Sequence, residues 1–310
     1  MTTHKFFGGA SLAFGWLYLV FYVIFSSIFT LCIKWVHVRG KEDIITAGAI
    51  NYIVAALIIA PWFVIDGQQT GNREAILAGG SMGMMYFINF FFVIWCVRVV
   101  GASSTTVVGV LSMLMPIIYA ALVWKSQPHW LQAVGIALAL VSLIMIGLKP
   151  DRQAKLIDKG VAAKSEKRTF SWNAPLILGG FFLLCGLSRI AQESFKYLSE
   201  ASQKPTFLLA AFVASGVPSI VLLLKRRRKV LPMEAIVGVA MGIANGSQTW
   251  FTLKSLDAMQ GYIFFPVSSA GGIIFTMFVA VLWMQEKISR RALIGIAIAV
   301  VALVMMNMSQ

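Results

Sequence analysis

Of the 310 residues in the chain, 59% are hydrophobic and 12% are charged, which is about half the charged share of an ordinary soluble domain. This composition excludes a soluble enzyme or binding domain, because one soluble core of this size could not bury so much apolar surface. The net charge of +14 at pH 7 requires no nucleic-acid partner, since contact with an anionic membrane surface accounts for it.

Ten apolar segments follow one another along the chain. Each is long enough to cross a hydrocarbon core, which needs roughly 20 residues in a helix. We place the spans at 14–34, 44–65, 75–97, 103–124, 130–148, 175–198, 206–224, 233–253, 261–284 and 292–308. Strands of a membrane barrel are shorter and alternate in polarity. The sequence therefore predicts an all-α integral membrane protein with ten transmembrane helices.

The last five segments resemble a second copy of the first five. Lys34 recurs as Lys196 at an offset of 162, and Gly135-Ile136-Ala137 recurs as Gly295-Ile296-Ala297 at an offset of 160. Five spans per copy is an odd number, so the second copy enters the membrane from the opposite side. Such inverted repeats suit alternating access around a central site, although channels and structural proteins can also be duplicated. We divide the chain into a first five-helix repeat at 1–148, a polar linker at 149–172 and a second five-helix repeat at 173–310.

Local patterns around the fourth span of each copy carry a family resemblance. The first copy has Gly101-Ala102-Ser103-Ser104 and then Pro116 within the span, and the second has the glycine- and serine-rich stretch 261–272 with Pro266. With the count and duplication of spans, these patterns resemble the EamA-type repeat of the drug/metabolite transporter superfamily. The resemblance implies a secondary carrier for small polar or amphipathic metabolites, with no cofactor and a central cavity lined mainly by spans one to four and six to nine. The prolines interrupt helices and free backbone carbonyls that a cavity could use.

The two copies differ after the fourth span. The resemblance implies an acidic residue there in each copy. Glu286 fits in the second copy, whereas Lys125 begins the corresponding stretch of the first. Only the second half can therefore supply this carboxylate.

Charged residues inside the predicted spans are the first candidates for a substrate site, because ionisable groups are costly within a membrane. Arg189, Glu193 and Lys196 are spaced by four and three residues in the sixth span, so they share one helix face. We expect Arg189 and Lys196 to attract an anionic group of the substrate, and Glu193 to titrate or to bind a cationic group. The alternative is that Arg189 and Glu193 neutralise each other. Lys34 either lines the cavity mouth or extends to the interface.

Uncharged polar and aromatic residues inside spans form a second set of candidates. Asn245 and Gln248 are three residues apart on one face, where they can bind substrate or join helices by hydrogen bonds. No HExxH motif and no clustered Cys/His metal set occurs in the sequence, so we expect no enzyme and no metal site. The substrate-binding candidates of this second set are Tyr86, Asn89, Asn245, Gln248, Trp250 and Ser268.

These features predict a carrier that moves a small polar or amphipathic metabolite, such as an amino acid or an amine, by alternating access. A proton or an exchanged solute is the expected coupling partner. Two other classes stay open: a flippase for a lipid or lipid carrier, and a membrane scaffold or receptor that transports nothing. Nineteen of the 26 Lys and Arg residues lie on the side of the central linker, which places the linker in the cytoplasm and both termini outside the cytoplasmic (inner) membrane. The family resemblance instead implies cytoplasmic termini.

Overall fold

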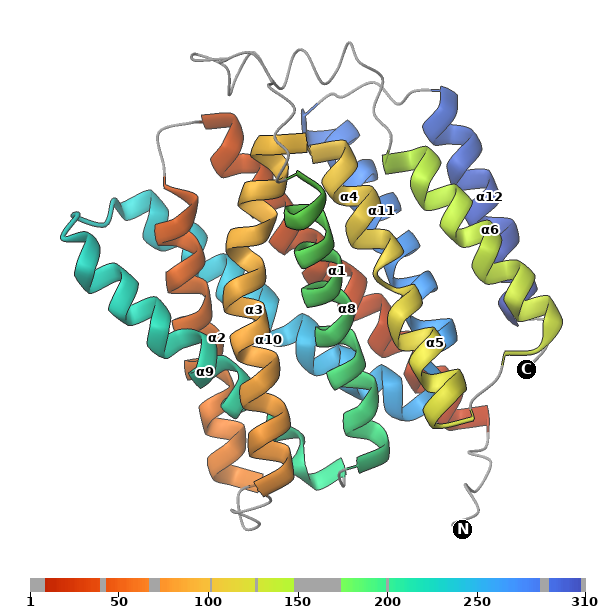
Figure 1. The fold of residues 1–310 in the computed structure, drawn as a ribbon, viewed down its shortest axis with the longest axis horizontal. Coiled ribbons are helices and arrows are strands. Elements are labelled where there is room, and N and C mark those ends of the chain that lie inside the picture. Colours follow the sequence, from red (N-terminus) through yellow and green to blue (C-terminus); the bar gives the residue numbers. More distant parts are fainter. Residues whose placement is uncertain are drawn as a thin grey trace.

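A computed structural model of the chain describes residues 9–39, 43–66, 73–100, 102–125, 128–147, 174–198, 201–284 and 290–307. Within these ranges every regular element is a helix, and helices occupy all ten predicted spans (Figure 1). The all-α prediction is confirmed, whereas the linker at 149–172 and Glu286 lie outside the described residues. The helices are α1 (Gly9–Arg39), α2 (Ile44–Asp66), α3 (Arg73–Val100), α4 (Ala102–Leu111), α5 (Leu114–Val123), α6 (Trp130–Gly147), α8 (Ala174–Leu198), α9 (Lys204–Arg226), α10 (Pro232–Ala258), α11 (Gly261–Met284) and α12 (Arg290–Asn307).

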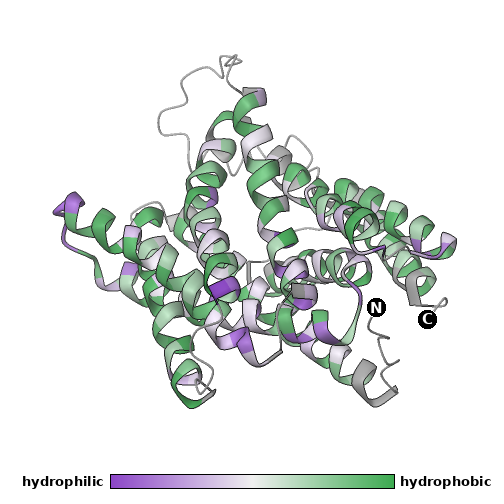
Figure 2. Ribbon diagram, turned by 60° about the horizontal axis from the view of Figure 1, so that its bottom comes forward, coloured by the Kyte–Doolittle hydropathy of each residue, from purple (hydrophilic) through white to green (hydrophobic). Residues whose placement is uncertain are grey.

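The outer surface of the bundle is apolar. Leu57, Leu122 and Leu224 are 66%, 76% and 72% exposed, and hydrophobic residues extend along most of the helices (Figure 2). Five described helices, α1, α2, α3, α8 and α9, are long and apolar enough to cross a membrane by length and composition. A surface of this kind is stable in contact with lipid and not with water.

The two repeats interlock. Corresponding helices meet across the pseudo-symmetry, since α2 packs on α9 and α6 packs on α12. The other large contacts come in matched pairs: α1 on α10 corresponds to α8 on α3, and α2 on α10 corresponds to α9 on α3. This exchange indicates a two-fold relation between the two halves, which an inverted repeat requires. Figure 1 shows α6 and α12 side by side at one edge of the bundle.

Small residues allow the matched pairs to pack closely. Gly79 and Gly83 of α3 lie against backbone carbonyls of α9, where a methyl group on either glycine would collide. Their counterparts Gly238 and Gly242 of α10 lie in the same way against α2. Small residues four apart bring helix backbones together within a membrane. Close packing at small residues therefore stabilises both of these corresponding interfaces.

The fourth span is broken into α4 and α5. Proline has no backbone N–H, so Pro116 cannot donate to the carbonyl of Ser112, which instead accepts from the N–H of Met115 at 3.2 Å. The N–H of Met113 bonds to the carbonyl of Val110 at 3.0 Å, so the carbonyl of Gly109 lacks its usual helical partner. The carbonyl that Pro116 leaves without its usual donor, that of Ser112, is thus satisfied by Met115, so Pro116 does not itself leave a carbonyl free, contrary to the expectation. Pro266 lies within the continuous helix α11.

Candidate functional site

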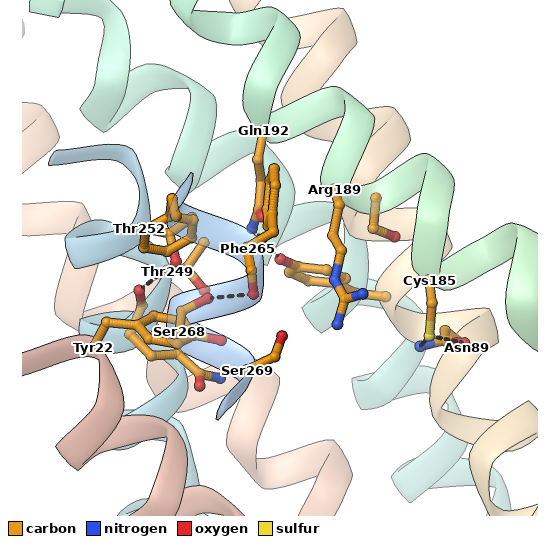
Figure 3. A pocket seen from close by; sticks show the side chains of 14 residues that line it. Tyr22, Asn89, Cys185, Arg189, Gln192, Thr249, Thr252, Phe265, Ser268 and Ser269 are labelled. Carbon is orange, nitrogen blue, oxygen red and sulfur yellow. Dashed lines mark hydrogen bonds between the residues drawn. The ribbon is translucent and has the colours of Figure 1, made fainter. Parts of the chain in front are cut away.

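A cavity of about 160 Å³ lies between helices of both repeats, near the middle of α1, α3 and α8 (Figure 3). Five helices line it, corresponding to spans one, three, six, eight and nine. Its walls combine aromatic rings with hydroxyl and amide groups. The lining residues are Tyr22 of α1, Tyr86 and Asn89 of α3, Cys185, Ser188, Arg189 and Gln192 of α8, Gln248, Thr249 and Thr252 of α10, and Phe264, Phe265, Ser268 and Ser269 of α11.

Arg189 is held by the break in the fourth span. Its Nη1 donates to the freed carbonyl of Gly109 at 3.1 Å and to Oγ of Ser112 at 2.9 Å. Because Gly109 lies in the last turn of α4, the guanidinium also faces the negative end of that helix dipole. Among the described residues the ion pairs involve Lys204, Arg226 and Arg228, so Arg189 has no carboxylate partner there. The predicted alternative in which Arg189 and Glu193 neutralise each other is therefore not what the structure contains.

Glu193 lies one turn further along α8 and outside the cavity lining. Its side chain is fully buried, and neither carboxylate oxygen has a hydrogen-bond partner among the described residues. The carboxylate lies against Gly261, the first residue of α11, so closely that a methyl group there would collide with it. The negative group thus faces the positive end of the α11 dipole.

Lys196 also points away from the cavity. Its Nζ donates to the carbonyl of Met259 at 3.2 Å and to Oε1 of Gln260 at 3.5 Å. Met259 follows the last residue of α10, so this cation faces the negative end of a helix dipole. Arg189, Glu193 and Lys196 thus meet three helix ends of matching sign, and only Arg189 reaches the cavity.

The neutral residues of the cavity are partly bonded to one another. The hydroxyl of Tyr86 accepts a hydrogen bond from Nε2 of Gln192 at 2.6 Å. Asn89 and Cys185 face each other, with 3.4 Å between Nδ2 and Sγ. Ser268 donates to the carbonyl of Phe265 at 3.1 Å. These contacts fix side-chain positions and still leave acceptors and donors directed at the space between the helices.

The structure brings five of the sequence candidates together: Tyr86, Asn89, Arg189, Gln248 and Ser268. It places four others elsewhere. Asn245 is buried within the bundle and accepts from Gln248 at 3.0 Å, and Trp250 packs on Trp62 with 4.2 Å between ring centroids. Glu193 and Lys196 face the turn between α10 and α11. The side chain of Lys34 lies outside the described part of the chain.

Several lining residues were not among the sequence candidates: Tyr22, Ser188, Gln192, Thr249 and Thr252. A signal for two of them was present. Positions 185, 188, 189 and 192 follow the spacing of one helix face, so Ser188 and Gln192 continue the face that carries Arg189. Thr249 and Thr252 had no comparable signal, because hydroxyl residues are common at packed membrane interfaces.

Comparison with known proteins supports the same architecture. Residues 13–148 match the EamA-like transporter family. A solved structure described only as "Crystal structure of protein" is similar with a TM-score of 0.71 at 12% identity, over 96% of this chain and 98% of its own; at that identity the likeness shows the fold alone. No protein of curated function matches the chain by sequence. The first half of the chain is thus an EamA-like domain of the drug/metabolite transporter superfamily, as the resemblance indicated. The match of residues 13–148 and the apolar helices support a multi-pass membrane protein of the EamA transporter type.

Proposed function

We propose that the protein is a secondary carrier that moves a small polar metabolite through the cavity around Arg189 by alternating access. The observation that carries the proposal is the position of this cavity near the middle of α1, α3 and α8, between helices of both repeats. An inverted repeat offers two related ways of closing around such a site. A scaffold without transport would have no use for a polar cavity containing a charge that lacks a carboxylate partner.

We assign the coupling proton to Glu193, with an exchanged solute as the alternative. Glu193 is buried, lacks hydrogen-bond partners among the described residues and lies one turn from Arg189 on α8. Buried ionisable groups in membrane helices commonly serve as proton relays. In this mechanism the protonation of Glu193 biases the contact between α8 and α11, and so the side to which the cavity opens.

The proposed orientation in the inner membrane places the linker side in the cytoplasm. The exposed loop between α9 and α10 carries the basic run Lys225-Arg226-Arg227-Arg228-Lys229, and Figure 2 shows it as a hydrophilic tip of the bundle. Positive residues in short loops favour the cytoplasmic side and its anionic lipids. Labelling of a cysteine introduced at Lys229 in intact cells tests this orientation, since reaction with an impermeant reagent would contradict it.

Flux in proteoliposomes tests the carrier function. Purified protein is first screened by thermal shift against amino acids, amines, sugars, nucleotides and organic acids, because a ligand of the folded state raises the melting temperature. The compounds that respond are then tested for uptake with and without a pH gradient. We expect uptake that saturates and that Arg189→Gln abolishes. Lys254→Gln is the matched control, because Lys254 lies over the ring of Trp250 outside the cavity.

Three results would separate the alternatives. Saturable uptake that Glu193→Gln makes independent of the pH gradient supports proton coupling. Uptake that ignores the gradient in the unaltered protein supports exchange. Absence of uptake for every compound contradicts the carrier, and movement of a labelled phospholipid between leaflets would then favour the flippase.

A further inference from the structure

We infer that the cavity selects a small organic anion and binds its negative group at Arg189. This inference rests on the proposed carrier function and names the substrate class of the same site. It also narrows the sequence-based expectation, which included amines.

The charge of the described cavity lining is positive only. Arg189 is the only charged residue among the 14 described residues that line the cavity, and none of them is acidic. The carboxylate of Glu193 is turned to Gly261, and that of Asp257 is paired with Lys204. A cationic amine in the cavity would therefore meet a positive charge with no lining carboxylate to compensate it. An anion would supply the counter-charge that the described protein lacks.

The guanidinium has donors to spare. A guanidinium carries five N–H groups, and the two on Nη1 are used by Gly109 and Ser112. The N–H groups on Nη2 and Nε have no acceptor among the described residues. Figure 3 shows the group pointing from α8 into the cavity. A planar group with free donors on adjacent nitrogens matches a carboxylate or phosphate in bidentate geometry.

The two existing hydrogen bonds of Arg189 also favour the binding of an anion. They fix the guanidinium at the end of α4 before any substrate arrives, so binding an anion does not require the side chain to be ordered again. Neither acceptor is charged, so neither neutralises the positive charge. The break between α4 and α5, where the carbonyl of Gly109 loses its usual helical partner Met113, thereby positions Arg189 while leaving its charge available to the substrate.

Cys185 provides a reporter that does not require the substrate to be known. Cys185 is half-buried, lines the cavity and lies one helical turn before Arg189. In a background with Cys32→Ala and Cys96→Ala, the labelling rate of Cys185 is measured by intact mass. One reagent is the anionic sulfonatoethyl methanethiosulfonate, and the other is the cationic trimethylammonioethyl methanethiosulfonate. Each rate is divided by the rate of the same reagent with a small free thiol, which removes intrinsic reactivity.

We expect the anionic reagent to react about ten-fold faster after this correction, because a charged cleft concentrates ions of opposite sign by such factors. Arg189→Gln should remove the preference, and Arg189→Lys should keep it. Lys196→Gln is the matched control, since Lys196 carries the same charge on α8 but faces the turn at Met259. Equal rates, a faster cationic reagent, or a preference that survives Arg189→Gln would overturn the inference. Absence of labelling by either reagent would also overturn it, because an anion must reach the cavity through water.

The same assay separates this inference from the proposed function. The reagents are added to either face of proteoliposomes that contain the protein. A preference for the anion that depends on Arg189 but appears from one face only would keep the substrate class and contradict alternating access. Labelling from both faces without a charge preference would keep alternating access and contradict the substrate class.

Discussion

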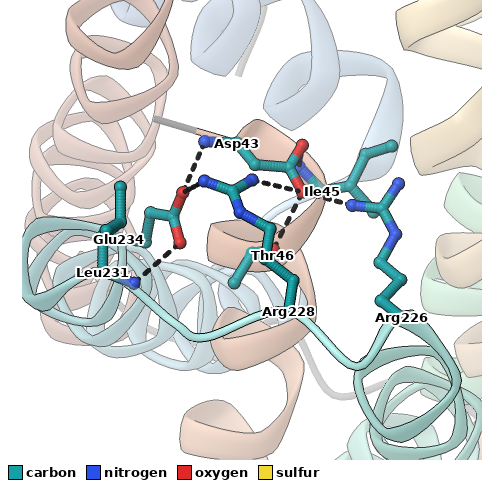
Figure 4. Close-up of polar contacts among 7 residues, drawn as sticks. All are labelled: Asp43, Ile45, Thr46, Arg226, Arg228, Leu231 and Glu234. Atoms are coloured by element: carbon teal, nitrogen blue, oxygen red, sulfur yellow. Dashed lines mark hydrogen bonds and ion pairs between the residues drawn. The ribbon is translucent and has the colours of Figure 1, made fainter. Parts of the chain in front are cut away.

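A fully buried glutamate lies at each end of α10: Glu234 of α10 itself at the N-terminal end, and Glu193 of α8 at the C-terminal end. At the N-terminal end, the carboxylate of Glu234 accepts from the backbone N–H of Leu231 at 3.0 Å, from that of Asp43 at 2.8 Å and from Nη2 of Arg228 at 2.7 Å (Figure 4). At the C-terminal end, the carboxylate of Glu193 lies against Gly261 with no hydrogen-bond partner among the described residues. The same side chain, equally buried, is thus provided with donors in one place and left without them in the other.

The contacts of Glu234 extend into a clamp between the repeats. Asp43 pairs with Arg226 and Arg228, and it also accepts from the hydroxyl of Thr46 at 2.8 Å at the start of α2. Arg227 lies between the two arginines, and its positive φ of 48° turns the chain at the end of α9. The clamp therefore fastens the start of α2 in the first repeat to the α9–α10 loop in the second.

The comparison indicates different roles for the two carboxylates. A buried charge that has its hydrogen bonds in place determines local geometry, whereas one without them is costly to bury. The cost at Glu193 is offset in part by the nearby positive charge of Lys196 and by the dipole of α11. Groups held in an unfavourable environment of this kind are commonly found at functional positions. We therefore regard Glu234 as part of the architecture and Glu193 as the group that can change state.

The largest expected effect is the difference in stability between a variant that neutralises Glu234 and one that neutralises Glu193. Glu234→Gln leaves Arg228 with Asp43 as its remaining carboxylate and takes the acceptor from one of two backbone N–H groups, so we expect a loss of about 3 kcal/mol in the free energy of unfolding. Glu193→Gln breaks no hydrogen bond among the described residues and removes only the attraction to Lys196, so we expect a clearly smaller loss. Unfolding of the purified variants in detergent measures both. Equal losses in the two variants would contradict the comparison.

A smaller effect is expected from filling the space beside Glu193. Gly261→Ala pushes a methyl group into the carboxylate, and crowding of this kind costs about 1–3 kcal/mol. In the double variant with Glu193→Ala the loss should be clearly less than the sum of the two single losses, because the colliding group is gone. Gly80→Ala is the matched control, since Gly80 has open space beside it. Strict additivity would show that Glu193 does not lie against Gly261.

Much of the fold could be predicted because membrane spans are a property of local composition. Helices cover all ten expected segments, with ends within about five residues of the expected positions, since a long apolar run has few alternatives. The break between α4 and α5 was only partly foreseen. Pro116 is visible in the sequence, but the exchange of hydrogen-bond partners at Met113 and Ser112 depends on the tertiary setting of that turn.

The candidate site could be predicted less well, and α8 shows why. Arg189 and Lys196 do share a helix face, but seven residues separate them by about 10 Å along the axis. Over that distance the face passes the end of α4, then the start of α11, then the end of α10. A single sequence gives the face and not the neighbours opposite it, so all three charges were assigned to a cavity that only Arg189 reaches.

The smallest expected effect lies in the clamp at Asp43, whose partners Arg226 and Arg228 are 34% and 43% exposed. Asp43→Asn keeps an acceptor for Thr46 and for the start of α2, because asparagine caps helices about as well as aspartate. Only the charge is lost, and partly exposed ion pairs contribute about 1 kcal/mol or less. Asp43→Ala removes the cap as well, which adds about 1 kcal/mol. Unfolding at low and high salt separates the two terms, since screening weakens the ion pairs and leaves the cap intact. The difference between Asp43→Asn and the unaltered protein should therefore shrink in high salt, whereas the difference between Asp43→Ala and Asp43→Asn should not. A salt-independent loss in Asp43→Asn would mean that this end of α10 is held by hydrogen-bond geometry alone, and the contrast with Glu193 would then rest on the donors of Glu234 and not on charge.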